Sequence, residues 1–172
     1  MKGEVNFYLK KGQLVKDKNA VSLSERYLEK ARNNLLTMGV LSEIQQNKEA
    51  REVLKIPKEY NSDEWVVICG YYAMYSAALA LLAKTGFRSK NHAATLAVLE
   101  EYFVKKKHLD NKDLSLIKDA KLQKEEIEKV SEARHKREIA QYSVTKQTTK
   151  SIAEKIKKDA YDFINKVELI LE

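Results

Sequence analysis

The sequence predicts an all-α protein, an up-and-down bundle of four to five helices. Three observations point to this class. Charged residues make up 33% of the 172 positions, only one proline and five glycines interrupt the chain, and Lys, Glu, Ala and Leu are abundant. Such a composition favours amphipathic helices over a sheet. A chain of this length fits one domain with a single core.

The first helix of the bundle is expected after a basic lead-in. Residues 1–20 are rich in lysine and lack periodicity, so we expect an irregular N-terminal lead-in followed by one helical domain over 21–172. Ser22 and Glu25 have the spacing of a capping box. Apolar residues then recur every three or four positions, as on one face of a helix: Leu23, Tyr27, Ala31, Leu35 and Met38.

A central helix is expected over an uncharged run at residues 65–83. Pro57 ends the helical segment before it, and the acidic stretch 61–64 suits a helix start. Gly86 suits its end, because glycine adopts the left-handed conformation. The run is nearly long enough to span a membrane. Its alanines and tyrosines lower its hydrophobicity, so we expect the buried centre of a bundle instead.

Three further helices are expected in the second half of the chain. Ser89 is placed to cap the third helix, a long charged helix covers 112–142, and Thr148 to Ser151 opens the last one. The last helix carries an apolar stripe on one face: Ile152, Ile156, Ala160, Phe163, Val167 and Ile170.

Charge and cysteine content limit the function classes. The net charge of +7 is compatible with a polyanion such as RNA, and equally with a solvated lysine-rich surface. Cys69 is the only cysteine, which excludes an intramolecular disulfide and a cysteine-rich zinc site. No apolar signal segment follows Met1, so we expect a cytoplasmic protein that is not membrane-bound.

Common enzyme signatures are absent from the sequence. It contains no phosphate-binding loop, no dinucleotide fingerprint, and neither the zinc-protease nor the nucleophile-elbow motif. His92, His108 and His135 do not have the spacing that places two imidazoles on one metal ion. We therefore expect no metal site and no cofactor.

Two segments resemble a known helical family. The segment from Tyr71 to His92 begins Tyr-Tyr-Ala-Met, continues with small residues and a Leu-Leu pair, and ends in a Gly-aromatic turn with basic residues and a histidine. It resembles the second helix of HEPN domains (higher eukaryotes and prokaryotes nucleotide-binding). Arg137-Glu-Ile-Ala-Gln-Tyr142 resembles the Arg-x-x-Ala-Asp-Tyr ending of the family. The resemblance covers roughly residues 64–165.

The resemblance implies a bundle of about four helices, often a homodimer, that binds a nucleotide or RNA. It also implies a nucleotidyltransferase-type protein partner, as in a toxin–antitoxin pair. Active ribonucleases of the family use an arginine followed about four to six residues later by a histidine. Here Arg137 is followed by Tyr142 instead. A tyrosine, with a pKa near ~10, is a poor general base at neutral pH, so the sequence favours binding over catalysis.

Several residues are candidates for a phosphate or nucleotide site. Arg134 and Arg137, one turn apart, can hold a phosphate through paired N–H donors, or they can form ion pairs that only stabilise the bundle. Tyr142 either shares that site or packs in the core. His92, near Arg88 at a helix start, can receive an anion or simply pack.

The tyrosines of the central helix and the overall function each have more than one interpretation. The rings can stack on a base or pack in the core: Tyr71, Tyr72 and Tyr75. We expect a nucleotide- or RNA-binding module. The alternatives are a metal-independent endoribonuclease toxin with an Arg-x4-Tyr site and a purely structural protein-interaction bundle.

Overall fold

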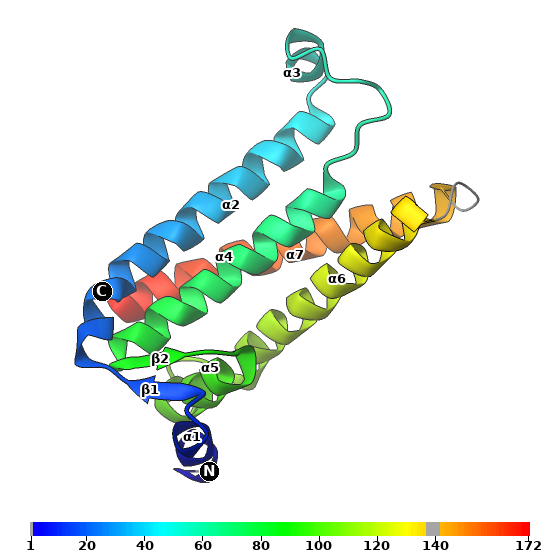
Figure 1. Ribbon diagram of the computed structural model, residues 1–172. Coiled ribbons are helices and arrows are strands. Elements are labelled where there is room, and N and C mark those ends of the chain that lie inside the picture. Colours follow the sequence, from blue (N-terminus) through cyan, green and yellow to red (C-terminus); the bar gives the residue numbers. More distant parts are fainter. Residues whose placement is uncertain (1, 137–141) are drawn as a thin grey trace.

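The computed structural model describes residues 2–136 and 142–172, with side chains over 3–129 and 150–172 (Figure 1). This part of the chain contains seven α-helices, two short strands, a 3-10 helix and a π-helical turn. In chain order they are α1 (Lys2–Lys10), β1 (Leu14–Lys16), η1 (Lys18–Leu23), α2 (Ser24–Gln46), α3 (Lys48–Val53), α4 (Asp63–Lys84), β2 (Phe87–Ser89), α5 (His92–Leu99), η2 (Glu100–Val104), α6 (Asn111–Lys136) and α7 (Tyr142–Leu171).

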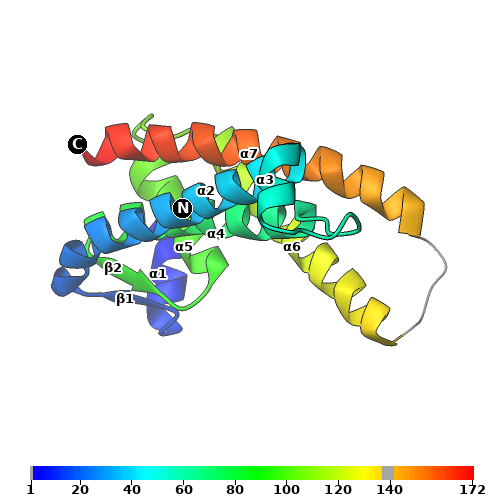
Figure 2. The ribbon, with the colours of Figure 1, turned by 90° about the horizontal axis from the view of Figure 1, so that it is seen from above.

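The four long helices form the bundle, and α4 lies at its centre. In Figure 1, α2 and α6 lie on either side of α4, and α7 runs behind it. Seen from above, the end of α6 and the start of α7 diverge from each other (Figure 2). The expected all-α class is confirmed. Of the expected stripe on α7, Ile156, Ala160, Phe163 and Val167 are buried, and Ile152 and Ile170 pack half-buried against the core.

By length and composition alone, helix α4 could span a membrane. However, 72% of its most apolar 18-residue stretch is buried inside the protein. Its packing against α7 is close. A Cβ atom on Gly70 would lie 2.5 Å from Cγ2 of Ile156 and 3.1 Å from Sδ of Met38. Neighbouring helices thus surround most of α4, as expected for the central helix of a bundle.

The first twenty residues differ from the irregular lead-in that the sequence predicted. They contain α1, β1 and the first half of η1. The strand β1 pairs antiparallel with β2, so that Leu14 lies opposite Ser89. Val5 and Leu14 are buried in the hydrophobic core. Burial of these two side chains fixes the N-terminal segment against the core. Its helix and strand are too short to show a recognisable hydrophobic pattern in the sequence.

Three predicted helix starts are corrected. The Ser22 hydroxyl donates to the carbonyl of Asn19 rather than capping α2, and α2 begins at Ser24 without a side-chain cap. Ser89 belongs to β2, and Asn91 caps α5 instead by accepting from the backbone N–H of Ala94. Helix α7 begins at Tyr142 rather than near Thr148, because no glycine or proline stops it earlier.

Candidate nucleic-acid interface

One line of residues on α4 is only partly covered by the other helices. Trp65 is 56% exposed and Tyr72 is 40% exposed, while the rest of the line is half-buried. The line follows the 3,4 spacing of one helix face: Trp65, Ile68, Tyr72, Tyr75 and Leu79. We call these five residues the open face. Exposed aromatic side chains in a row are more informative than exposed single apolar residues.

His92, at the start of α5, contacts two tyrosine rings of α4: Tyr75, which belongs to the open face, and Tyr71, which lies beneath it. The imidazole stacks on the ring of Tyr75, with centroids 3.8 Å apart and planes 18° apart. Its Nε2 atom lies 2.6 Å from the hydroxyl oxygen of Tyr71. Tyr71 is itself buried and lies edge-on to Tyr72, with ring centroids 4.9 Å apart. The position of the exposed Tyr72 ring therefore depends on the packed rings of Tyr71, Tyr75 and His92 beneath it. We call these three rings the aromatic layer.

Burial keeps the His92 and Tyr71 side chains neutral. It raises the pKa of Tyr71 well above its usual range, and the nearby Tyr75, Tyr72 and glutamates of α6 act in the same direction. Burial also lowers the pKa of His92, with Lys121 and Lys124 adding to the effect and Glu125 opposing it. The neutral phenol and the neutral imidazole share one hydrogen bond between the Tyr71 hydroxyl and Nε2 of His92. The other ring nitrogen, Nδ1, is buried and has no hydrogen-bond partner among the described residues.

Lys124 of α6 borders the aromatic layer. The Lys124 ammonium lies 5.5 Å from the ring centroids of both Tyr71 and Tyr72, within the range of a cation–π contact. Lys124 also forms an ion pair with Glu128, at 2.8 Å. Burial lowers the pKa of Lys124, but hydrogen bonding to Glu128 and the nearby Tyr72 outweigh it, so the net pKa is raised. Lys124 is therefore fully charged at neutral pH.

This arrangement suits an unpaired nucleotide. An exposed ring that is fixed from below can stack on a base, because every base has a π face. The Lys124 ammonium beside it can contact the adjoining phosphate in exchange for its ion pair with Glu128, whose side chain is 46% exposed. Such i,i+4 pairs contribute only about 0.3–0.5 kcal/mol, so a phosphate can readily replace the carboxylate.

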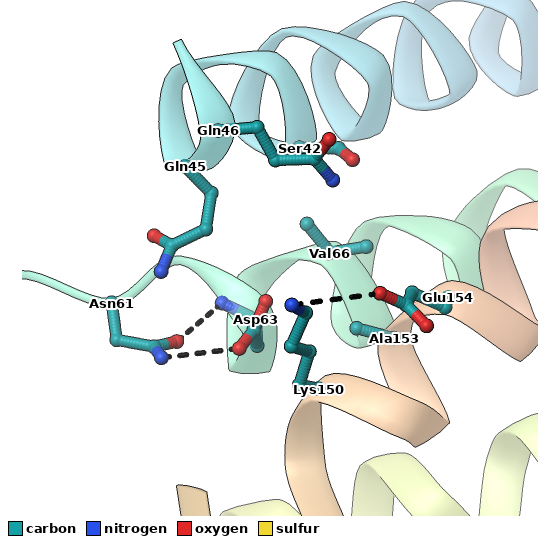
Figure 3. Close-up of a pocket in the computed structure, with 9 residues that line it drawn as sticks. All are labelled: Ser42, Gln45, Gln46, Asn61, Asp63, Val66, Lys150, Ala153 and Glu154. Carbon is teal, nitrogen blue, oxygen red and sulfur yellow. Dashed lines mark hydrogen bonds and ion pairs between the residues drawn. The ribbon is translucent and has the colours of Figure 1, made fainter. Parts of the chain in front are cut away.

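A hollow of about 590 Å³ lies at the other side of α4, between the end of α2 and the start of α7 (Figure 3). The side chains at its mouth, Lys150 and Glu154, come from α7 and lie 3.9 Å apart. Its remaining lining is mainly polar and comes from α2, α4, the segment before α4, and Ala153 of α7. The residues from the first three are Ser42, Gln45, Gln46, Asn61, Asp63 and Val66. Among the described residues, no group of three or more His, Cys, Asp or Glu is placed to hold a metal ion.

Sequence comparison assigns the chain to a family. It is 30% identical to a UPF0332 protein of Archaeoglobus fulgidus over 128 residues, which are 73% of this chain and 91% of that protein. The chain belongs to the UPF0332 family. No family model matches the chain, and no solved structure matches it.

The candidates from the sequence fall in different parts of the UPF0332 structure. Arg137 lies outside the described residues, and the side chains of Arg134 and Tyr142 lie outside the described part as well. Arg88 is half-exposed on β2 and forms an ion pair with Asp17, at 2.8 Å. His92 packs on tyrosines rather than standing free at the start of α5. Arg88 and His92 thus contact different partners.

Sequence reasoning identified the three tyrosines of α4 but did not separate their roles. Tyr71 packs in the core, whereas Tyr72 faces solvent beside Lys124. Lys121 and Lys124 were missed, although both lie within the strongly charged part of the predicted long helix. The signal that could have found the site is the regular spacing of Trp65, Tyr72 and Tyr75 on one face of an otherwise buried helix.

Proposed function

We propose that this UPF0332 protein is a HEPN-type binding module that holds single-stranded RNA on the open face of α4. The observation that carries the proposal is the exposed ring of Tyr72, fixed by Tyr71 and bordered by the Lys124 ammonium. Stacking on exposed aromatic side chains, together with lysine contacts to phosphates, is the general mode of binding single strands.

The spacing along α4 supports an extended strand rather than a single base. Trp65 and Tyr72 lie seven residues apart on one face, a rise of about 10 Å along the helix. Two exposed rings at this separation can contact different bases of one strand. The net charge of +7 adds long-range attraction for the phosphate backbone.

The proposal is binding rather than catalysis. The resemblance to HEPN domains offers Arg137 for a phosphate contact, with Arg134 three residues before it in the sequence, but Tyr142 stands where a ribonuclease of the family has histidine. His92 does not supply the missing base, since its Nε2 is hydrogen-bonded to the Tyr71 hydroxyl and its Nδ1 is buried. The same resemblance supports a homodimer and a nucleotidyltransferase-type partner, which co-purification from the native cell would test.

The experiment is a titration of fluorescein-labelled oligouridylate, followed by anisotropy, with two matched lysine variants. Lys124→Met keeps the aliphatic stem beside the tyrosines and removes the charge, and we expect it to weaken binding by about fivefold or more. Lys155→Met is the control. Lys155 also forms an i,i+4 ion pair, with Asp159, but on α7. We expect little change for this control.

Three results would overturn the proposal. The first is the absence of oligouridylate binding to the wild-type protein at low salt. The second is an equal effect of the two lysine variants, which would mean that only the overall charge matters. If Lys124→Met or Tyr72→Ala instead alters the oligomeric state in light scattering with no effect on RNA, the open face is a protein interface and the proposal fails.

A further inference from the structure

The hollow between α2, α4 and α7 contains two polar groups whose orientations are fixed by their neighbours. The first is the side-chain amide of Gln45. The backbone N–H of Ser62 donates to Oε1 of Gln45 at 3.1 Å, and the Ser62 hydroxyl lies 3.2 Å from the same oxygen. A backbone N–H can only donate, so the oxygen must face Ser62 and the NH₂ group is the free end. That NH₂ group has no hydrogen-bond partner among the described residues.

The second group is the carboxylate of Asp63, the first residue of α4. The residue is only 7% exposed. The side chain of Asn61 holds it from one side: Nδ2 of Asn61 donates to Oδ2 of Asp63 at 3.1 Å, and Oδ1 of Asn61 accepts from the backbone N–H of Asp63 at 2.8 Å. Within the described residues, no lysine or arginine forms an ion pair with Asp63. The carboxylate therefore retains acceptor capacity that the protein does not use.

Figure 3 shows the amide of Gln45 above the Asn61–Asp63 pair, at one side of the hollow. A fixed NH₂ donor beside a fixed carboxylate acceptor is complementary to a ligand edge that presents one acceptor beside adjacent donors. We propose that this hollow binds the guanine base of a guanine nucleotide. The base would place its O6 carbonyl on the amide of Gln45, and its N1–H and N2–H donors on the carboxylate of Asp63.

Other ligands of similar size match this pair of groups less well. Adenine can accept from Gln45 at N1 and donate its N6 amino group to Asp63, but it offers the carboxylate a single N–H donor group where guanine offers two, N1–H and N2–H. A guanidinium group can pair with Asp63 but has no acceptor for the NH₂ group of Gln45. Sites that form hydrogen bonds to a ligand reject an analogue that leaves their polar groups unpaired.

The mouth of the hollow suits a phosphate. Lys150 is exposed, and its ion pair with Glu154, at 3.9 Å, is long and open to solvent. A pair of this kind contributes little, so the ammonium is available to a phosphate group. The volume of about 590 Å³ lies within the usual range for small-molecule sites. This site is separate from the open face and does not depend on RNA binding there.

The test is isothermal titration of GMP, IMP and AMP into the wild-type protein. We expect GMP to bind at least about tenfold more tightly than AMP, and IMP to bind more weakly than GMP because it lacks the N2 amino group. Asp63→Asn should weaken GMP binding by about tenfold or more. Asp119→Asn, an exposed carboxylate of α6, is the matched control and should leave GMP binding unchanged.

A second variant guards against misfolding of Asp63→Asn. In Gln45→Glu an oxygen can still accept from Ser62, but a carboxylate oxygen would replace the NH₂ group and repel O6 of guanine. We expect this variant to lose GMP binding while it keeps the wild-type melting temperature. Absence of GMP binding, equal affinities for GMP and AMP, or full GMP binding by the folded variants would each overturn the proposal. Since oligouridylate contains no guanine, failure here is distinguishable from failure at the open face.

Discussion

The imidazole of His92 lies flat on the ring of Tyr75, with centroids 3.8 Å apart and an angle of 18° between the planes. This contact joins the start of α5 to the middle of α4, and the bond between His92 and Tyr71 reinforces it at 2.6 Å. The aromatic layer is therefore rigid on the side away from solvent. Tyr72 stands on this layer, which reduces the ordering cost of stacking against a base.

Stability should fall when the pH drops below the usual pKa of histidine, partly because of His92. Its pKa in the folded protein is lowered by burial and by Lys121, so the unfolded chain binds a proton more readily than the folded protein does. The folded state is then progressively disfavoured below the ordinary value of 6.5. Above that value, both states carry neutral His92 and its contribution does not change.

Thermal unfolding at pH 7.5 and pH 5.5 measures this effect. His92→Gln removes the titrating group, so we expect its melting temperature to fall less between the two pH values than that of the wild type. His108→Gln, at an exposed position, is the matched control and should behave as the wild type does. An identical loss in wild type and His92→Gln would show that other groups cause the pH dependence.

Gly70→Ala should destabilise the protein by about 1–3 kcal/mol, the usual cost of overpacking a core. The new Cβ would lie 2.5 Å from Cγ2 of the buried Ile156, so α4 and α7 would have to separate slightly. Gly3→Ala is the matched control in α1, where no atom lies within 4 Å. That variant should gain up to about 1 kcal/mol from helix propensity. Urea unfolding of both proteins gives the comparison, and equal stabilisation would contradict the close packing.

Emission from Trp65 should change when RNA binds. Trp65 is the only tryptophan, it is 56% exposed, and it lies on the open face two turns before Tyr72. We expect oligouridylate to quench its fluorescence and to protect it from acrylamide, because a base would cover the ring. Saturating oligouridylate that leaves both signals unchanged would place the RNA away from Trp65.

The long elements of the fold were predictable because their signals are local. The uncharged run at 65–83, followed by Gly86, indicated α4, and Gly86 does adopt a positive φ of 76°. The buried stripe of α7 followed from its periodicity. The strand pair could not be predicted, since three residues show no pattern and Leu14 pairs with Ser89 across 75 positions of sequence. That pairing also removed Ser89 from the role of a helix cap.

The candidate site was only partly predictable, for a related reason. The sequence indicated that the tyrosines of α4 either stack on a base or pack in the core, but the choice at each position depends on where α6 lies. Tyr71 is covered by His92, whereas Tyr72 is bordered by Lys124 and remains open. Charged residues on an amphipathic helix look alike in sequence, so nothing singled out Lys124. The prediction for Arg137 concerns residues outside the described part.

The affinity of oligouridylate for Tyr72→Ala, compared with Tyr161→Ala, tests the central claim most directly. The two tyrosines are exposed to a similar degree, 40% for Tyr72 and 37% for Tyr161. Tyr161, however, lies on α7 next to α2, where its hydroxyl is 3.1 Å from the position that a Cβ atom would take on Gly39. Loss of one stacked base costs about 1–3 kcal/mol. We therefore expect Tyr72→Ala to weaken binding by about fivefold or more, and Tyr161→Ala to bind as the wild type does. Equal affinities for the two variants would contradict RNA binding on the open face.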